Sequence, residues 1–241
     1  MNHEFKIVLF AYNFQHKKTV DFIHKIYDVG FSISLILAAD FVKINKPKSL
    51  FNHAPKPESI LPKELAESYK IPYYVVKHNS LEAQHLLKKH EINFGIISGS
   101  RILKKELLSL VRYGVLNFHP GLLPMIRGVD SILWSIYKEQ AIGVTAHLIN
   151  EYIDSGLLVY KKKIIIDKND DLQSLFKKNY QLQLDLIPIS LNLVFENSDS
   201  IYQFEKLEKN INYNSYMPYK LQLELKPKIN TYIKRYFQHE S

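Results

Sequence analysis

Short apolar runs alternate with segments of helical periodicity through the first half of the chain. A strand followed by a helix and then by another strand favours a parallel sheet with helices on its faces. The sequence therefore predicts an α/β fold with a mostly parallel sheet. The expected helices are Lys17–Val29 and 80–91, and the expected strands are Lys6–Tyr12, 31–39, Ile71–Lys77, Asn93–Gly99 and Gly114–His119.

The second half of the chain has longer elements. We expect a strand at 156–167 and then a helix at Asp170–Phe195, which Pro188 should kink or end because proline lacks the backbone N–H. A terminal amphipathic helix at 221–237 should be interrupted near Pro227.

Residues Asp40 to Pro62 contain several Pro and Lys residues and show no clear periodicity. A segment of this length without secondary structure is usually functional or mobile in a compact domain. We expect it to form a loop near the bound ligand.

The charge of the chain favours anionic partners. Its 32 Lys and Arg residues exceed its 24 Asp and Glu residues, which gives a net charge of +8 and a pI of about 9.3. Phosphorylated metabolites, nucleic acid or an acidic membrane surface would suit this charge. A solvated lysine surface explains it equally well.

The chain has no cysteine, which excludes disulfides and thiolate metal sites and fits a reducing cytoplasm. No apolar run approaches the ~20 residues that span a bilayer. The apolar part of the N-terminus is too short for a signal peptide. We therefore expect a soluble, cytoplasmic protein.

One polar pair lies at the end of the last strand expected in the first half. Asn117 and His119 occupy alternate positions of that strand, so their side chains point to the same side. Ligands of open α/β sheets bind beside the carboxyl ends of strands, where this pair falls. An amide can donate to the oxyanion that forms when an amine attacks a carbonyl, and an imidazole can take the proton of the amine. The pair suits acyl transfer to an amine.

A carboxylate follows in the segment "YIDSG". Asp154 precedes Gly156, which permits a tight turn. Near His119, its carboxylate would stabilise the imidazolium and hold a water that relays the proton. Aspartate before Ser-Gly is otherwise a common turn former. His147 in "GVTAH" fits a core histidine or a residue near the site.

Three separated segments around these residues resemble the signature of the formyltransferases that use 10-formyltetrahydrofolate. The segments are an Asn-x-His-Pro strand end, a "LLP…RG" loop and a "GVT-x-H…D-x-G" strand and loop, in that order within residues 92–160. The resemblance implies a Rossmann-like formyltransferase domain and catalytic roles for Asn117, His119 and Asp154. It also implies 10-formyltetrahydrofolate as the formyl donor. No cluster with metal-ligand spacing is evident, so no metal is expected.

The resemblance also places the pterin ring of the donor in a slot between two segments, whose backbone groups would read its amide-like edge. The residues expected to bind this cofactor are Ser98, Gly99, Ser100, Arg101, Ile102, Glu151 and Tyr152.

Four residues are expected to bind the acceptor: Tyr12, Lys77, Asn79 and Arg127. Tyr12 would stack on a base, as would the Tyr-rich stretch 213–216. Lys77 and Asn79 would hold a pyrophosphate or a hexose, although a strand-end lysine and a helix N-cap asparagine explain them equally well. Arg127 offers a planar fork of donors to a phosphate or carboxylate and is as well suited to anchoring its own loop.

Departures from the family pattern reduce the number of acceptors that fit this chain. Members that act on glycinamide ribonucleotide carry a Gly-Ser-Asn phosphate loop after the first strand, whereas this chain has the glycine-free "FAYNFQHKK". Members that act on initiator methionyl-tRNA add a tRNA-binding domain, and formyltetrahydrofolate hydrolases add an N-terminal regulatory domain. We expect neither domain here. The chain resembles the short bacterial nucleotide-sugar N-formyltransferases linked to O-antigen and lipopolysaccharide synthesis.

That resemblance implies dTDP-4-amino-4,6-dideoxyglucose or a close relative as the acceptor, a homodimer, and no binding of nucleic acid or membrane. It divides the chain into a catalytic domain, residues 1–168, and a C-terminal helical and irregular extension, residues 169–241, that packs on the domain and contributes to the dimer. Two alternatives stay open. They are formylation of another amine such as glycinamide ribonucleotide, and a basic nucleic-acid-binding protein.

Overall fold

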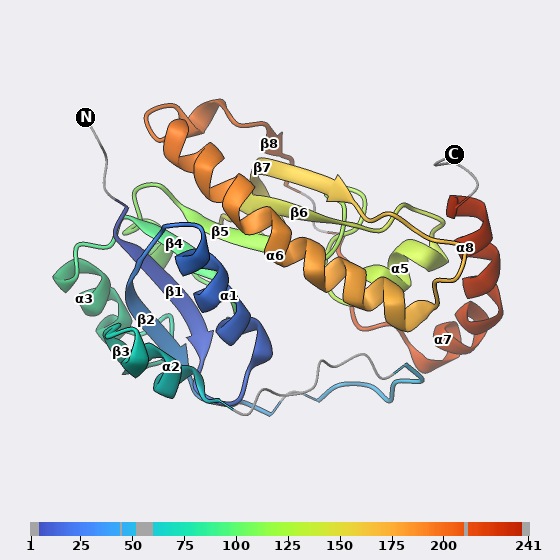
Figure 1. The fold of residues 1–241 in the computed structure, drawn as a ribbon, viewed down its shortest axis with the longest axis horizontal. Coiled ribbons are helices and arrows are strands. Elements are labelled where there is room, and N and C mark those ends of the chain that lie inside the picture. Colours follow the sequence, from blue (N-terminus) through green and yellow to red (C-terminus); the bar gives the residue numbers. More distant parts are fainter. Residues whose placement is uncertain (1–4, 44, 52–59, 210–211, 238–241) are drawn as a thin grey trace.

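A computed structural model describes residues 5–43, 45–51, 60–209 and 212–237. Its eight strands form one sheet with the order β3-β2-β1-β4-β5-β6-β7-β8 (Figure 1). The strands are β1 (Ile7–Tyr12), β2 (Ile33–Ala39), β3 (Tyr73–Val75), β4 (Phe94–Ile97), β5 (Val115–His119), β6 (Gly143–Leu148), β7 (Gly156–Lys163) and β8 (Lys206–Leu207).

The sheet changes direction at β5. The strands β3, β2, β1, β4 and β5 pair in parallel, whereas β6, β7 and β8 continue the sheet in antiparallel pairs. The predicted α/β fold with a mostly parallel sheet is confirmed. The strand that carries Asn117 and His119 is therefore parallel to β4 on one side and antiparallel to β6 on the other.

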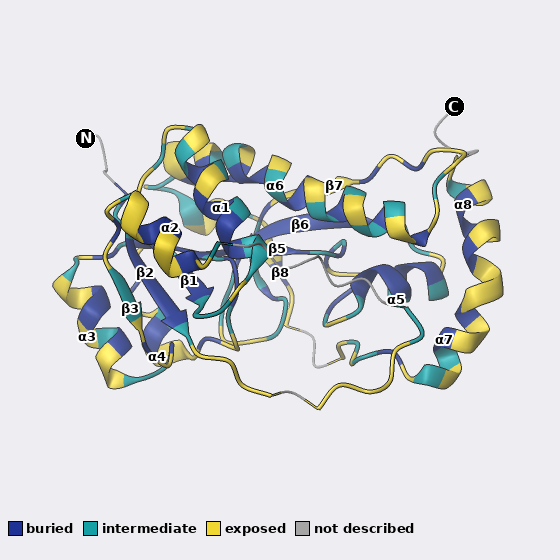
Figure 2. Ribbon diagram, turned by 60° about the horizontal axis from the view of Figure 1, so that its bottom comes forward, coloured by how far each residue is buried: buried dark blue, intermediate teal, exposed yellow. Residues whose placement is uncertain are grey.

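Helices cover both faces of the sheet, and the strands alternate their apolar side chains between two cores. Ile7 and Leu9 of β1 belong to a large core shared with α1 and α6, whereas Val8 and Phe10 face a smaller core shared with α3 and α4. Figure 2 shows the buried stripes of these helices turned towards the sheet. The helices are α1 (Lys17–Asp28), α2 (Pro62–Ser68), α3 (Leu81–Lys89), α4 (Lys105–Leu108), α5 (Ser131–Tyr137), α6 (Leu172–Glu196), α7 (Tyr219–Leu225) and α8 (Ile229–Phe237).

The long helix α6 decides one of the two expectations for Pro188. The proline does not end the helix, which continues to Glu196. Apolar side chains on both sides of the proline, Leu186, Ile187 and Leu191, are fully buried in the large core. Tertiary packing thus outweighs the backbone hydrogen bond that proline cannot donate.

The structure confirms the predicted interruption of the C-terminal helix near Pro227. A 3-10 turn, η2 (Lys226–Lys228), separates α7 from α8 and contains Pro227. A second 3-10 turn, η1 (Ile201–Gln203), precedes β8. Within the described ranges, none of the helices has both the length and the apolar character required to cross a membrane.

The segment after β2 crosses to the C-terminal helices. It runs along the side of the molecule towards which β1 points and reaches α7 (Figure 1). The backbone N–H of Leu50 donates to Oε1 of the buried Gln222 at 2.7 Å, and the Lys48 ammonium lies 5.2 Å from the centroid of the Tyr219 ring. Within the expected 40–62 loop, residues 44 and 52–59 lie outside the described residues.

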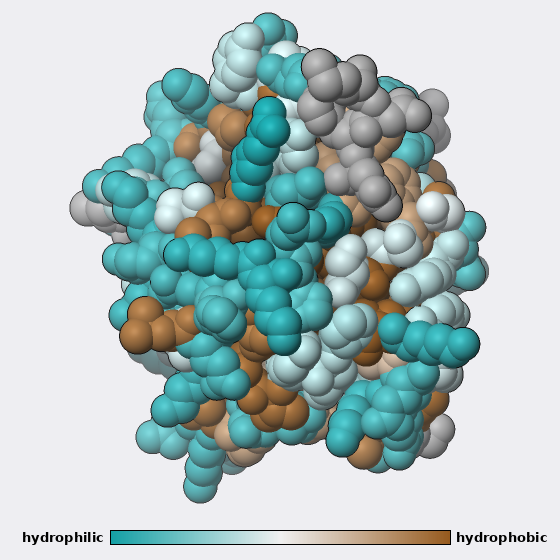
Figure 3. All heavy atoms as spheres, turned by 90° about the vertical axis from the view of Figure 1, so that its left-hand side faces the viewer, coloured by the Kyte–Doolittle hydropathy of each residue, from teal (hydrophilic) through white to brown (hydrophobic). Residues whose placement is uncertain are grey.

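The surface is mostly hydrophilic where Figure 3 views it, from the left-hand side of Figure 1. Brown apolar patches on this face are small and separated by teal side chains. Scattered apolar groups of this kind are ordinary for a folded protein, so this face does not point to a partner.

Candidate active site

The site is built around the carboxyl end of β5. Register pairs Asn117 with His147 and His119 with Thr145 across the antiparallel contact between β5 and β6. The parallel strands on the other side end at the same edge of the sheet, because parallel strands share one direction. The site can therefore receive side chains from the carboxyl ends of the parallel strands and from the antiparallel strand β6.

His119 and Asp154 lie together although they are distant along the chain. Nδ1 of His119 is 3.3 Å from Oδ1 of Asp154. The other ring nitrogen, Nε2, donates to the carbonyl oxygen of Ile126 at 2.8 Å. Since Nε2 carries the hydrogen in the neutral ring, Nδ1 presents a lone pair towards the carboxylate. A proton taken up by this ring would lie between Nδ1 and Asp154.

The environment favours the neutral form of His119. Burial lowers the pKa of the imidazole, and the Asp154 carboxylate and the Ile126 carbonyl oppose this shift in part. The positive charges of Lys18 and Arg127 lower the pKa further. The ring is therefore a base in the resting protein, and the carboxylate stabilises it once it is protonated.

A second histidine orients the Asn117 amide. Nδ1 of the fully buried His147 donates to the Ser155 carbonyl oxygen at 3.0 Å, which leaves Nε2 as an acceptor. Nδ2 of Asn117 lies 3.2 Å from that Nε2, so one amide hydrogen points to His147. Burial lowers the pKa of His147 to about 4, so it stays neutral and keeps this role. The second amide hydrogen of Asn117 is left to meet a ligand.

Hydrogen bonds from residues 127 and 128 hold the loop that carries Asp154. The backbone N–H of Gly128 donates to Oδ2 of Asp154 at 2.5 Å, which fixes the carboxylate that faces His119. Asp154 has a φ of 48°, and Gly156 has a φ of 111°. A Cβ at Gly156 would lie 1.9 Å from the Leu148 carbonyl oxygen, so only glycine fits this turn.

The Arg127 guanidinium forms its hydrogen bonds with other groups of the protein. Its buried guanidinium donates to the carbonyl oxygen of Asp154, to Oγ of Ser155 at 2.8 Å and to the carbonyl oxygen of Glu208 at 2.8 Å. These contacts tie the Asp154 loop to the segment after β8. This is the arrangement of a loop anchor, the second of the two roles that the sequence allowed.

The segment expected to bind the pterin follows β4. The side chain of Ser98 is buried and donates to the Phe10 carbonyl oxygen at 3.1 Å, so it serves the fold. Ser100 offers its carbonyl oxygen to the Tyr12 hydroxyl at 2.9 Å. Arg101 is exposed, and the Ile102 side chain is 65% exposed.

Backbone groups in this segment are available to a ligand. The N–H groups of the exposed residues 101 and 102 donate no hydrogen bond within the part of the chain that the structure describes. Together with the exposed Ile102 side chain, they offer donors beside an apolar contact. Such a combination fits a flat heterocycle with an amide-like edge.

The second expected pterin segment is exposed. Glu151 and Tyr152 both reach solvent, and the Lys209 ammonium lies 4.0 Å from the centroid of the Tyr152 ring. They precede Asp154 in the same loop, so a ligand held there would adjoin the catalytic carboxylate.

The residues expected to bind the acceptor are dispersed. Tyr12 is brought to the segment after β4 through its bond to Ser100. The Asn79 side chain donates to the Ile102 carbonyl oxygen and accepts from the Lys104 N–H, both at 2.8 Å. The N-cap of α3 is Ser80 and not Asn79. Lys77 lies exposed at the far end of the parallel sheet, after β3.

The sequence left His147 open as a core histidine or a residue near the site, and it gave no indication of Lys18. Lys18 lies in the first turn of α1, half-buried, with its ammonium 5.1 Å from the centroid of the Phe22 ring. Burial lowers its pKa to about 8, and its charge is one of those that lower the pKa of His119. The sequence analysis predicted only a helix over Lys17–Val29, so nothing in the sequence marked this position.

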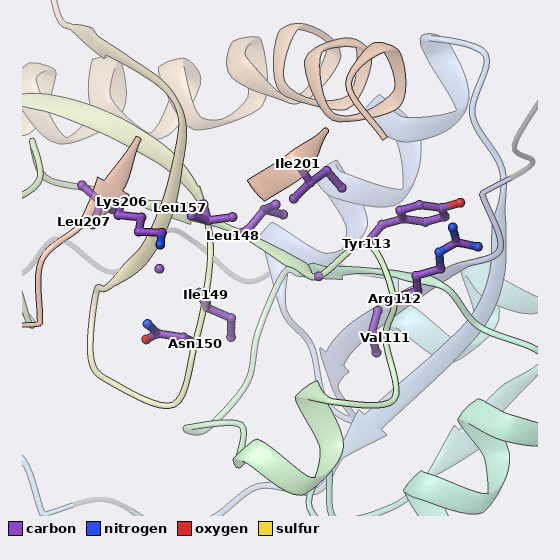
Figure 4. Close-up of a pocket in the computed structure, with 12 residues that line it drawn as sticks. Val111, Arg112, Tyr113, Leu148, Ile149, Asn150, Leu157, Ile201, Lys206 and Leu207 are labelled. Carbon is purple, nitrogen blue, oxygen red and sulfur yellow. The ribbon is translucent and has the colours of Figure 1, made fainter. Parts of the chain in front are cut away.

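A separate hollow of about 410 Å³ lies at the amino end of β5 (Figure 4). Figure 4 shows Leu148, Leu157 and Ile201 gathered near its centre, with Arg112 and Lys206 at opposite sides. None of the three catalytic candidates lines it. Two of its lining residues, Asn150 and Gly156, flank the Asp154 loop.

A family model described as formyl transferase matches residues 34–191, which include Asn117, His119, His147 and Asp154. Among sequence relatives, the methionyl-tRNA formyltransferase of Prochlorococcus marinus (strain MIT 9312) is 37% identical over 121 residues, 50% of this chain and 34% of that protein. The chain spans less than two thirds of the length of the curated relatives it matches.

Solved structures share the fold at low identity. The phosphoribosylglycinamide formyltransferase from Bacillus halodurans aligns with a TM-score of 0.61 at 20% identity, over 83% of this chain and 100% of that chain. A sugar N-formyltransferase from Shewanella sp FDAARGOS_354 aligns with a TM-score of 0.57 at 23% identity, over 88% of this chain and 76% of that chain.

Proposed function

The chain belongs to the formyl transferase family, and from this membership we propose that it transfers a formyl group from 10-formyltetrahydrofolate to the amine of a nucleotide-linked amino-deoxysugar. The observation that carries the proposal is the convergence of His119, Asp154 and the oriented Asn117 amide at the carboxyl edge of the sheet. These groups match the needs of an amine attacking a formyl carbon.

Asn117 is the oxyanion donor in this proposal. The amine nitrogen forms a bond to the formyl carbon, and negative charge develops on the formyl oxygen. The amide hydrogen that His147 leaves free meets that charge. A donor that is already oriented does not have to reorganise as the charge appears.

His119 and Asp154 take the proton. The attacking amine loses one proton to this pair, which would then hold it at Nδ1 next to the carboxylate. The bond between the formyl carbon and N10 of the folate then breaks, and N10 gains a proton from the same pair. The products are the formamide and tetrahydrofolate.

The segments 98–103 and 149–152 would hold the formyl donor. The N–H groups of residues 101 and 102, which donate to no acceptor among the described residues, support this assignment, and the exposed Ile102 and Tyr152 side chains offer apolar surface to its ring. Within the described ranges, no group of three or more His, Cys, Asp or Glu residues could hold a metal ion.

The sugar acceptor is supported by three observations. The turn after β1 lacks glycine, the chain carries a net charge of +8 that suits a pyrophosphate, and one solved neighbour is named a sugar N-formyltransferase. We propose dTDP-4-amino-4,6-dideoxyglucose or a close relative, used in O-antigen synthesis. A homodimer, a cytoplasmic location and the division after residue 168 belong to the same proposal.

Initiator methionyl-tRNA is a second candidate acceptor, because sequence relatives are named methionyl-tRNA formyltransferases. Glycinamide ribonucleotide is a third, from a solved neighbour. The test is incubation of the protein with 10-formyltetrahydrofolate and each of the three amines, followed by mass spectrometry of the acceptor. Formylation of the nucleotide sugar alone supports the proposal. Formylation of the tRNA or the ribonucleotide in preference to every nucleotide sugar refutes it.

A further inference from the structure

Four aromatic rings cluster after β1 and β2: Tyr12, Phe14, His16 and Phe41. The rings of Tyr12 and Phe14 are stacked, with centroids 5.0 Å apart. The edge of His16 meets Tyr12 at 5.1 Å, and the edge of Phe41 meets Phe14 at 5.6 Å. We refer to these four residues as the aromatic cluster.

Phe41 is not a core residue. Its side chain is 69% exposed, and its one ring partner is Phe14 within the ranges that the structure describes. Isolated exposed aromatics are common on protein surfaces. Phe41 differs because its ring contacts a group of three packed rings while most of its side chain stays exposed.

The aromatic cluster lies on the same edge of the sheet as the catalytic groups. Strand order places β1 two positions and β2 three positions from β5. With about 4.8 Å between neighbouring strands, the cluster begins roughly 10 Å from His119 and reaches about 14 Å from it. An extended molecule with an amine at one end and a flat ring at the other can span that distance.

One cation lies beside the rings. The Tyr12 hydroxyl donates to the carbonyl oxygen of Ser100 at 2.9 Å, and the exposed Arg101 is the next residue. Its charge opposes the rise that burial causes in the pKa of Tyr12. The nearby carboxylate of Asp40 accepts a hydrogen bond from Asn13.

We propose that the aromatic cluster binds the base of a nucleoside diphosphate against the exposed ring of Phe41, with Arg101 beside the diphosphate. Aromatic rings stack on any base, and cations beside them follow the phosphates. This inference rests on the proposed function, since it names the part of the acceptor that lies away from the reacting amine. A ligand bound in this way directs its sugar towards Asn117 and His119.

The test is a calorimetric titration of dTDP, UDP and inorganic pyrophosphate into the folate-free protein. Phe41→Ala should weaken dTDP or UDP binding at least five-fold, the smallest effect expected of a lost base stack. Phe41→Trp should bind within a few-fold of the wild type, and pyrophosphate affinity should be the same in all variants. Tyr202→Ala is the matched control, since Tyr202 is 71% exposed and should leave every affinity unchanged.

Three results would overturn the inference. The first is that Phe41→Ala binds both nucleotides like the wild type, and the second is that the wild type binds neither. The third is that a CCA trinucleotide competes more tightly than either nucleotide, which would favour an RNA acceptor. Failure of the proposed function would look different: the protein would bind the nucleotide but would not formylate the nucleotide sugar.

Discussion

Nδ2 of Asn117 lies 3.2 Å from Nε2 of His147, which in turn is held by a bond from its Nδ1 to the Ser155 carbonyl oxygen. The histidine therefore selects which end of the Asn117 amide faces the ligand. Ser155 follows Asp154, so the same histidine couples the Asn117 amide to the loop that carries Asp154. In this arrangement His147 is a positioning residue.

Replacing His147 should lower kcat more than it changes KM. His147→Leu removes the acceptor for the Asn117 amide, so the amide can rotate and present its oxygen to the developing oxyanion. We expect a fall in kcat of about ten-fold or more, below the ~100- to 1,000-fold typical of deleting an oxyanion donor. His147→Gln keeps an acceptor and should recover part of the rate. Steady-state kinetics of both variants decide this, and equal rates in them would contradict it.

Stability should fall as the pH is lowered through the weakly acidic range. Burial lowers the pKa of His147 to about 4 from its ordinary 6.5, so the unfolded chain binds more protons between these values. The free energy of unfolding then decreases from pH 6.5 to 4, by up to about 1.4 kcal/mol per pH unit for this residue.

Urea unfolding at pH 7, 6, 5 and 4.5 measures this dependence. His147→Gln should flatten it, whereas His85→Gln, at an exposed position of α3, should leave it unchanged. An identical slope in wild type and His147→Gln would show that His147 does not carry the effect.

Lys18→Met should move the acid limb of the kcat/KM pH profile to higher pH. The Lys18 charge is one cause of the lowered pKa of His119, so its removal lets that pKa rise towards the ordinary value. The acid limb reports the base of the free enzyme. A shift of at least a few tenths of a unit is expected. Lys18→Arg keeps the charge and should keep the profile, so an unshifted limb in Lys18→Met would count against this role.

Arg127→Met should destabilise the fold and reduce activity together. The substitution leaves the acceptors of Asp154, Ser155 and Glu208 without their donors. Glu208 is exposed and its carbonyl can bind water, so at about 1–3 kcal/mol for each of the other two groups left unpaired, a loss of roughly 2 kcal/mol or more is expected. Arg235→Met is the control, because Arg235 pairs with Glu139 at the exposed surface and should cost below about 1 kcal/mol. Similar losses of unfolding free energy in both variants would argue against the anchor.

The strands of the first half, including the strand that carries Asn117 and His119, could be predicted because local patterns mark them, whereas the strand order could not. Apolar runs identified β1, β2, β4 and β5, and alternate positions on β5 placed Asn117 and His119 on one side. The closeness of Asp154 to His119 came from the family resemblance, since nothing local joins residues so far apart along the chain.

The remaining contacts depend on tertiary register. His147 faces Asn117 only because β6 pairs antiparallel with β5, and Arg127 is buried only because Glu208 returns to the site after β8. Neither pairing leaves a local signal. The continuation of α6 past Pro188 has the same origin, since buried neighbours in the large core hold the helix together.

The most direct test of the site is the turnover number of Asn117→Ala and His119→Ala, measured together with the affinity of each variant for the nucleotide-sugar acceptor. The arrangement predicts that kcat falls by at least about 100-fold in each variant, because each loses a group aimed at the reacting carbon. Acceptor affinity should stay within a few-fold of the wild type. A variant that keeps the wild-type kcat, or that loses turnover only because it no longer binds the acceptor, would contradict the assigned roles.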